Sequence, residues 1–214
     1  MRRRVDIFSD EFGNLFKSEK KRNFMSLAFL KQSLTEPKKI GAITESSEEL
    51  AEKIISMAEL ENAETIVELG PGTGIFTEKI LESIGPSTLF FALEINEAFV
   101  EKTKERCPNT IIYNAGAEEI CKYLALQNKE SCDCIISSLP FASFDEETQE
   151  AIFEAINNAL APNGQFITFS YFYTALLEEG KSFQKLLHKN FSTIEKSDIV
   201  WLNVPPAFVY SCKK

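Results

Sequence analysis

The feature that most constrains this chain is a glycine-rich segment, Gly70-Pro71-Gly72-Thr73-Gly74, between a β-like run and a helix-like stretch. The run before it, 65–69, is short and rich in β-branched residues, and the helical pattern after it continues to about Ser83. In an open α/β sheet, the turn after such a strand borders the ligand crevice at the carboxyl ends of the strands. Glycines at this place let backbone N–H groups approach a ligand closely.

The spacing of these glycines indicates the kind of ligand. The dinucleotide fingerprint G-x-G-x-x-G requires a glycine at position 75, where the chain has Ile75. We therefore expect a ligand without a pyrophosphate, and S-adenosylmethionine (SAM) fits that description. Glu94 closes the next apolar run, and a carboxylate at that strand end can accept hydrogen bonds from both ribose hydroxyls. An NAD-dependent enzyme also uses such an acid, but not this glycine spacing.

The rest of the chain continues the alternation of strand-like and helix-like segments. Strands are predicted at 65–69, 88–93, 110–113, 132–139, 165–171, 191–200 and 207–212, and helices at about 48–60, 75–83, 97–106, 117–127, 145–160 and up to 188. Alternation of this kind predicts parallel strands, right-handed crossovers and helices on both faces of the sheet. The last two strands are joined by residues 203–206 without a helix, so the final strand should run antiparallel to its neighbour.

The first forty residues differ from the rest in charge and pattern. They carry a net charge of +5, whereas residues 41–214 carry −14. Two amphipathic helical pieces are predicted, with a basic cluster between them, and Pro37 ends the second. We therefore divide the chain into an N-terminal amphipathic helical arm, 1–46, and a main domain, 47–214. The basic arm suits an anionic membrane surface, and a solvated helix face is the alternative.

Composition excludes several other classes of protein. A single histidine and five cysteines without a CxxC pair argue against a metal site, and they indicate reduced thiols in the cytosol. The sequence pI of 4.9 argues against a general nucleic-acid binder. Acidic residues interrupt the basic N-terminus, so no export signal is expected, and 155–177 contains too many turn residues to span a membrane. The predicted location is the cytoplasm, with peripheral attachment at the inner membrane face.

Five segments together resemble a known family. They are Lys39–Ile43, Val67–Gly74, Leu93–Asn96, Ser138–Ser143 and Asn203–Tyr210. The chain resembles the class I SAM-dependent methyltransferases, and among them the bacterial phospholipid N-methyltransferases, which are related to the ribosomal RNA adenine dimethylases. The resemblance runs from about Arg22 to Cys212. It implies an α/β, Rossmann-like fold with a seven-stranded, mostly parallel sheet whose last strand is antiparallel, preceded by the helical arm.

The resemblance also implies a binding site for SAM, with S-adenosylhomocysteine as the product. The 68–74 loop would hold the methionine part and Glu94 the ribose, and the segment around Ala42 and Ile43 would cover the cofactor. Related proteins often carry an acid that accepts from the adenine amino group, where this chain has Gly116. The Ala117 backbone or Glu118 is expected to hold adenine instead. The implied cofactor residues are Ala42, Ile43, Glu68, Gly70, Gly72, Gly74, Glu94, Ile95, Ala117 and Glu118.

The acceptor side is carried by Ser138, Leu139, Pro140 and Phe141, which in related amino-methylating enzymes face the transferred methyl group. Proline presents a fixed backbone whose carbonyl groups can accept from the nucleophile's N–H. The Phe141 ring is expected to shield the site or pack against a developing ammonium group. No firm general base is evident, and Tyr171, Tyr173 and Glu118 are weak candidates.

The leading hypothesis is a SAM-dependent N-methyltransferase that acts on the amine of a phospholipid such as phosphatidylethanolamine at the membrane surface. RNA adenine N6-methylation is one alternative, because adenine could stack on Phe141, but the acidic main domain argues against it. A small-molecule methyltransferase is another. The last is a SAM-binding, catalytically silent protein at the membrane, which would fit Gly116 and the missing base.

Overall fold

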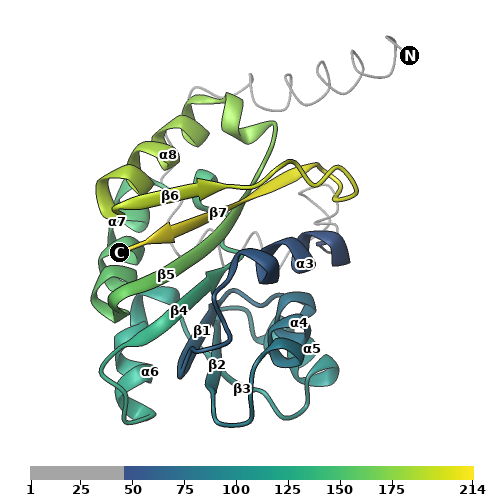
Figure 1. The fold of residues 1–214 in the computed structure, drawn as a ribbon, viewed down its shortest axis with the longest axis vertical. Helices are drawn as coiled ribbons and strands as arrows, with labels where there is room; N and C mark the ends of the chain where they lie inside the picture. Colours follow the sequence, from purple (N-terminus) through teal and green to yellow (C-terminus); the bar gives the residue numbers. More distant parts are fainter. Residues whose placement is uncertain (1–45) are drawn as a thin grey trace.

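A seven-stranded sheet forms the centre of the computed structural model, which describes residues 46–214 (Figure 1). Its strands are β1 (Thr65–Leu69), β2 (Leu89–Glu94), β3 (Ile111–Asn114), β4 (Cys132–Ser137), β5 (Leu160–Tyr171), β6 (Thr193–Lys196) and β7 (Ala207–Lys213). Their order is β3-β2-β1-β4-β5-β7-β6. The first five pair in parallel, and β7 pairs antiparallel with both β5 and β6. The predicted mostly parallel sheet with a reversed last strand is confirmed. The predicted arm lies outside the described residues, apart from its last position.

Helices cover both faces of this sheet (Figure 1). They are α3 (Glu48–Met57), α4 (Ile75–Ser83), α5 (Glu97–Arg106), α6 (Ile120–Leu126), α7 (Glu146–Ala159) and α8 (Glu178–Asn190), with short 3₁₀ turns at Ala117–Glu119, Phe141–Ser143 and Thr174–Leu176. Helices α3, α4 and α5 lie on one face, and α6, α7 and α8 lie on the other. This is the arrangement that parallel strands with helical crossovers require.

Side-chain caps fix the starts of three helices. Ser47 Oγ accepts from the Leu50 N–H at 3.2 Å to begin α3, and Asp145 Oδ1 accepts from the Thr148 N–H at 2.8 Å to begin α7. Asn96 Oδ1 accepts from the Ala98 N–H at 2.9 Å at the start of α5. Each cap satisfies a backbone N–H that has no partner inside its helix. The predictions of Ser46 or Ser47 and of Asp145 as caps are met at Ser47 and Asp145.

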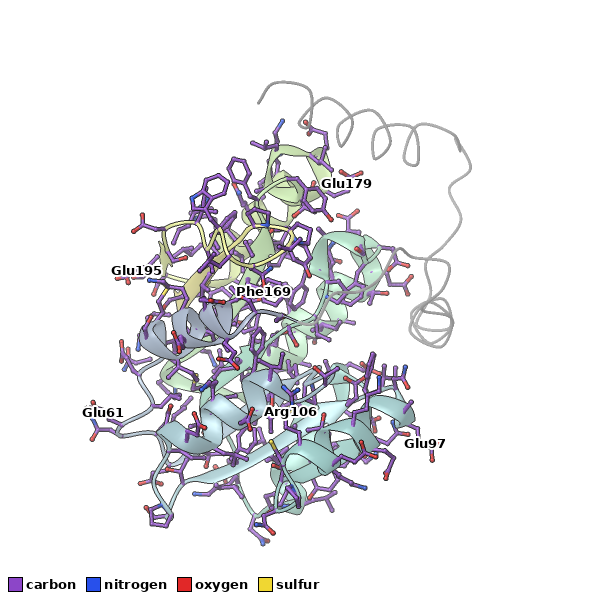
Figure 2. All side chains as sticks on the ribbon, turned by 90° about the vertical axis from the view of Figure 1, so that its right-hand side faces the viewer. Glu61, Glu97, Arg106, Phe169, Glu179 and Glu195 are labelled. Atoms are coloured by element: carbon purple, nitrogen blue, oxygen red, sulfur yellow. The ribbon has the colours of Figure 1, made fainter. Side chains whose placement is uncertain are left out.

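The alternation of side chains along β1 divides the core into two layers. Val67 and Leu69 face the layer beneath α6, α7 and α8, whereas Ile66 belongs to the layer beneath α3 and α4. Phenylalanine rings fill both layers, and Phe169 packs edge-to-face on Phe76 at 5.8 Å on the α3–α4 side (Figure 2). Exposed acids stand on the periphery, and Figure 2 shows Glu61, Glu97 and Glu195 pointing away from the body. The negative charge of the main domain is therefore borne largely at its surface.

The structure departs from the predicted elements in three places. The predicted strand 191–200 is paired only over Thr193–Lys196, and a single bridge joins Val200 to Ala207 further on. The predicted helix 117–127 is split into a 3₁₀ turn and the shorter α6. Strand β5 begins before the predicted turn at 162–164, because that turn forms an irregularity in the pairing with β4, with Asn163 at a φ of 63°. Local periodicity therefore located the elements but not the breaks in their hydrogen bonding.

Candidate functional site

The glycine loop between β1 and α4 adopts backbone conformations that other residues rarely take. Gly70, Gly72 and Gly74 have φ angles of 74°, 60° and 85°, all in the left-handed region. The Gly70 N–H donates to the Leu93 carbonyl at 2.9 Å, which ties the loop to the end of β2. The Thr103 hydroxyl of α5 donates to the Gly72 carbonyl at 3.0 Å. The loop is therefore held in one shape from two neighbouring elements.

Glu94, the last residue of β2, lies directly against this loop. Its Oε2 accepts from the Gly72 N–H at 3.2 Å, and its Oε1 accepts from the Asn96 N–H at 2.8 Å. Burial raises the pKa of the Glu94 carboxyl, and hydrogen bonds from the backbone N–H groups of Asn96, Gly72 and Ile95 oppose that rise. Each carboxylate oxygen has lone-pair capacity beyond the bond described. The pair of oxygens can thus accept from two adjacent hydroxyl groups.

Glu68 lies at the same end of β1 and is completely buried. The Thr77 hydroxyl of α4 donates to its Oε2 at 2.6 Å, while its Oε1 has no hydrogen-bond partner among the described residues. Burial raises the pKa of Glu68 from its ordinary value of 4.5 to about 8; the Thr77 bond lowers it and the nearby Glu94 raises it. At neutral pH this group is therefore a neutral carboxylic acid with a proton to donate.

Replacement of Glu68 by glutamine should change how stability depends on pH. The folded-state pKa lies above the unfolded value, so the folded state holds the proton while the unfolded state releases it between pH 4.5 and about 8. The contribution of this group to the free energy of unfolding is therefore greatest below pH 4.5. It falls by up to about 1.4 kcal/mol per pH unit as the pH rises from 4.5 to about 8. Chemical denaturation at several pH values should show a shallower decline for Glu68→Gln than for the wild type.

The control for that measurement is Glu61→Gln, which changes an exposed acid in the connection after α3. Its denaturation curves should follow those of the wild type at each pH. An unchanged slope in Glu68→Gln would mean that the buried carboxyl is ionised in the folded protein, contrary to the direction that its burial indicates.

The segment after β4 packs on the glycine loop. The Ser138 N–H donates to the Leu69 carbonyl at 3.0 Å, and the Ser138 hydroxyl donates to the Gly70 carbonyl. Leu139 is so close that a Cβ atom added to Gly70 would lie 2.9 Å from its Cδ2. The structure thus brings together the 68–74 loop, Glu94 and the 138–141 segment, three groups that the sequence analysis placed at one site. The left-handed φ of Gly70 favours glycine at this position.

Phe141 lies elsewhere than the sequence analysis expected. Its ring is only 2% exposed and stacks on Phe183 of α8, with centroids 5.1 Å apart and planes at 13°. It also contacts the rings of Phe144, Phe153 and Phe166. A ring at the first position of the 3₁₀ turn gains more by burial in this aromatic cluster than by remaining on the crevice. In this structure the ring is a core side chain, while Pro140 beside it is exposed.

The segment after β3 places Glu118 over the glycine at 116. A Cβ atom at Gly116 would collide with the carboxylate oxygens of Glu118, which folds back over that position. The carboxylate of Glu118 therefore occupies the place from which an acidic side chain at 116 would extend. Asn114 joins this segment to the site, since its Nδ2 donates to the Glu94 carbonyl at 2.9 Å. Ala117, at the start of the 3₁₀ turn, is half-buried beside them.

Other predicted and unpredicted residues complete the site. Ala42 and Ile43 lie outside the described residues. Sequence reasoning missed Thr77 and Thr103, which hold Glu68 and the Gly72 carbonyl from neighbouring helices. Both lie on helices at positions that face the sheet, and polarity at such a position is the signal that could have revealed them.

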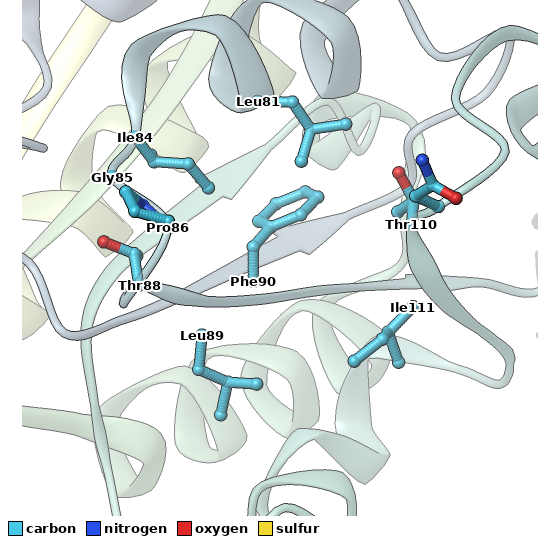
Figure 3. Close-up of a pocket in the computed structure, with 10 residues that line it drawn as sticks. Leu81, Ile84, Gly85, Pro86, Thr88, Leu89, Phe90, Thr110 and Ile111 are labelled. Carbon is cyan, nitrogen blue, oxygen red and sulfur yellow. The ribbon is translucent and has the colours of Figure 1, made fainter.

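A hollow in the described part of the chain lies away from this site (Figure 3). It has a volume of about 460 Å³ and lies at the amino ends of β2 and β3, between Leu89, Phe90 and Ile111. Its lining contains no charged side chain. The glycine loop is at the opposite edge of the sheet, where the carboxyl ends of the strands meet. This hollow therefore contributes nothing to the site around Glu94.

Comparison with known proteins identifies the family. A family model described as a methyltransferase domain matches residues 66–164, which include the glycine loop, Glu94 and the 138–141 segment. An ornithine lipid N-methyltransferase from Singulisphaera acidiphila is 27% identical over 179 residues, which cover 81% of this chain and 88% of the relative. The chain is a class I SAM-dependent methyltransferase.

Two further proteins resemble this methyltransferase, one in sequence and one in structure. Malonyl-[acyl-carrier protein] O-methyltransferase 2 from Ilyobacter polytropus is 31% identical over 68% of this chain, but the match spans only 56% of that protein. The structure of the N-methyltransferase NodS from Bradyrhizobium japonicum, in complex with S-adenosylhomocysteine, superposes with a TM-score of 0.63 at 12% identity. That match covers 86% of this chain and 97% of NodS, and it shows a common fold.

The cofactor of this methyltransferase is SAM. The residues present suit it: the glycine loop approaches without side chains, an added Cβ at Gly72 would meet no atom within 4 Å, and Glu94 offers two acceptor oxygens. Within residues 46–214, no group of three metal-ligating side chains is found, and no helix has the length and hydropathy needed to cross a membrane.

Proposed function

We propose that this methyltransferase transfers a methyl group from SAM to the amine of a membrane lipid of the phosphatidylethanolamine type. The observation that carries the proposal is the match to a lipid N-methyltransferase over 88% of that relative's length. The 138–141 segment supports it, because the family resemblance assigns this segment to amine acceptors. Two solved structures described as rRNA methylases match at 18% and 17% identity, which shows a common fold alone.

Within this proposal, the glycine loop and Glu94 hold the cofactor. The backbone of Gly70, Gly72 and Gly74 lies against the methionine part, and the two oxygens of Glu94 accept from the ribose hydroxyls. Bound SAM supplies a methyl group that its sulfonium has already activated. Glu68, which is also expected at the cofactor, is a neutral acid and so avoids placing a second full charge beside Glu94.

The acceptor nitrogen is oriented by the backbone after β4. The Leu139 carbonyl accepts from the Phe141 N–H at 2.9 Å and the Pro140 carbonyl from the Ser143 N–H at 2.8 Å, so each retains a lone pair for an N–H of the substrate. Holding a nitrogen in line with the methyl group at about 3 Å is the main contribution required of the protein. Phe141 acts indirectly, because its burial among other rings fixes the 3₁₀ turn that presents these carbonyls.

The amine must lose its proton before it attacks. A primary alkyl amine has a pKa of about 10 in water, and desolvation at the site lowers it toward the neutral form. Burial raises the pKa values of the Tyr171 and Tyr173 phenols, so both stay protonated at neutral pH and neither serves as a base. We propose that the amine releases its proton to solvent as it enters the site.

Incubation of the full chain with methyl-labelled SAM and separate pools of phosphatidylethanolamine vesicles, ornithine lipid, RNA and acyl carrier protein tests the acceptor. The proposal expects label in the lipid fraction, released on analysis as N-methylated head groups. Label confined to RNA or to acyl carrier protein would contradict it. SAM binding by calorimetry, without turnover on any pool, would instead support a catalytically silent protein.

Substitution of Glu118 by alanine should weaken SAM binding without affecting the fold. If the Glu118 carboxylate accepts from the adenine amino group in place of an acid at 116, its loss should lower the affinity about 3- to 10-fold, which corresponds to about one hydrogen bond. Calorimetric titration with SAM measures this.

The matched control is Glu119→Ala, which removes the neighbouring acid, whose Oε2 lies 2.5 Å from Lys122 Nζ at the surface. This variant should bind SAM as the wild type does. Equal affinities for the Glu118 and Glu119 variants would show that Glu118 makes no contact with adenine.

A further inference from the structure

Large apolar side chains are exposed on two neighbouring segments, which we call the apolar rim. The rim consists of Phe172, Tyr173, Leu176 and Leu177 after β5, and Trp201, Leu202 and Val204 before β7. Leu176, Trp201, Leu202 and Val204 are between 65% and 70% exposed. Such a concentration of exposed apolar area on a soluble surface marks an interaction site.

The two segments form one surface. The Phe172 N–H donates to the Pro206 carbonyl at 2.8 Å, and the rings of Phe172 and Trp201 lie 6.0 Å apart. Tyr173 stacks on Tyr171 at 5.9 Å, which fixes the first segment against the end of β5. The first segment follows β5 and the second precedes β7, so the two lie together at one end of the β5–β7 pair (Figure 1).

The rim lies at the edge of the sheet that also carries the candidate site. Strands β4 and β5 are parallel, so the residues after Tyr171 lie at the same edge as Ser138. Strand β7 is antiparallel to β5, with Ala207 opposite Tyr171, so the residues before Ala207 return to that edge. A partner bound at the rim would therefore stand next to the acceptor side of the site.

Charge distinguishes the rim from the rest of the surface. Neither 171–177 nor 199–212 contains a charged residue, although the main domain is strongly acidic. The described part of the chain begins beside the rim, since the Ser47 N–H donates to Asn203 Oδ1 at 2.9 Å, and Asn203 stands between Leu202 and Val204. An uncharged apolar surface of this kind complements the acyl boundary of a bilayer.

We infer that the apolar rim is a membrane-docking surface that inserts into the interfacial region of a lipid bilayer. Trp201 and Tyr173 suit the level of the lipid head groups, because each combines an apolar ring with one polar group, and such side chains are enriched at the membrane–water interface. The leucines and Val204 enter the acyl boundary. Docking brings the candidate site to the lipid head groups, so an amine lipid reaches it without leaving the bilayer. This inference rests on the proposed lipid acceptor, and its test separates the two.

Trp201 is the sole tryptophan of the chain, so its fluorescence reports on the rim alone. The full chain is mixed with uncharged vesicles of phosphatidylcholine and phosphatidylethanolamine at about 1 M salt, where the Debye length is about 3 Å and charge attraction is screened. Trp201 emission should shift to shorter wavelength, and phospholipids brominated near the head of their acyl chains should quench it.

Three results would overturn the inference. One is vesicle binding with unchanged Trp201 emission, since another surface would then make the contact. Another is a Trp201 that acrylamide fails to quench before vesicles are added, since residues 1–45 or a second copy would then cover the rim. Failure to bind uncharged vesicles at high salt would also overturn it.

Single substitutions locate the contact. Leu202→Ser and Leu176→Ser each remove an exposed side chain and should weaken vesicle partitioning about ten-fold, as expected for one leucine. The control is Leu126→Ser at the end of α6, where the leucine is 60% exposed. Partitioning of the control should stay within about two-fold of the wild type. Equal losses in all three variants would mean that binding is not directed by the rim.

Activity separates docking from the acceptor. On phosphatidylethanolamine in vesicles, Leu202→Ser should lose methyl transfer in proportion to its binding. On a short-chain phosphatidylethanolamine dissolved as monomers, it should turn over like the wild type. A wild type that inserts Trp201 but methylates neither form would support the docking surface and remove the proposed acceptor. Equal loss on both forms would overturn docking as the cause.

Discussion

Replacement of Phe141 by alanine is expected to lower the free energy of unfolding by about 3–5 kcal/mol, the usual cost of deleting a buried aromatic ring. The ring is 2% exposed, and it contacts four other phenylalanine rings, which come from the end of the 3₁₀ turn (Phe144) and from α7, β5 and α8. Its loss leaves a cavity that these elements cannot fill without shifting. Denaturant unfolding of wild type and variant measures the difference.

Phe141→Leu separates this structural role from a direct role at the acceptor. Leucine fills most of the cavity, so the loss of stability should be smaller, and methyl transfer should remain close to that of the wild type. If the aromatic face itself packed against a developing ammonium, the leucine variant would lose transfer while staying folded. That result would restore the expectation made from the sequence and would require the ring to leave its cluster.

Glu94→Ala is expected to weaken SAM binding by about 1–3 kcal/mol, or roughly 5- to 150-fold. The substitution removes the two oxygens proposed to accept from the ribose. It also leaves the N–H groups of Gly72 and Asn96 without their acceptor, which loosens the glycine loop. Calorimetry with SAM gives the affinity, and a melting curve shows how much of the change is structural.

Two controls sharpen this measurement. Glu94→Gln keeps one acceptor oxygen and the shape of the side chain, so it should lose less affinity than alanine. Glu97→Ala removes an exposed acid three residues further along the chain and should leave SAM binding unchanged. Unchanged affinity in Glu94→Ala would place the ribose elsewhere and remove the basis of the proposed cofactor site.

Much of the architecture could be predicted because it is encoded locally. The runs at 65–69 and 97–106 have the lengths and patterns of their elements, and the structure has a strand and a helix there with the same bounds. The glycine loop and Glu94 were also found, since they sit at consecutive strand ends and the topology of parallel strands brings such ends together.

The packing partners of individual side chains could not be predicted from the sequence in the same way. Phe141 lies in the core because three rings from other elements of the chain meet there, and no local sequence pattern predicts that meeting. Glu118 folds back over Gly116 because of a short 3₁₀ turn that replaced the start of a predicted helix. The predicted strand 191–200 is paired only over Thr193–Lys196, because β6 has only β7 as a neighbour and its pairing ends early; a single bridge joins Val200 to Ala207 beyond it.

The reversed strand β7 divides the sheet into two parts whose loops differ in how freely their length and sequence can change. Strands β1 and β2 carry the glycine loop and Glu94, whereas the hairpin that ends in β7 opens at the same edge from the far side of β5. Lengthening or recomposing that hairpin leaves the pairing of β1 with β2 untouched. Proteins built on this plan can therefore diversify in what they act upon while their donor-holding half stays constant.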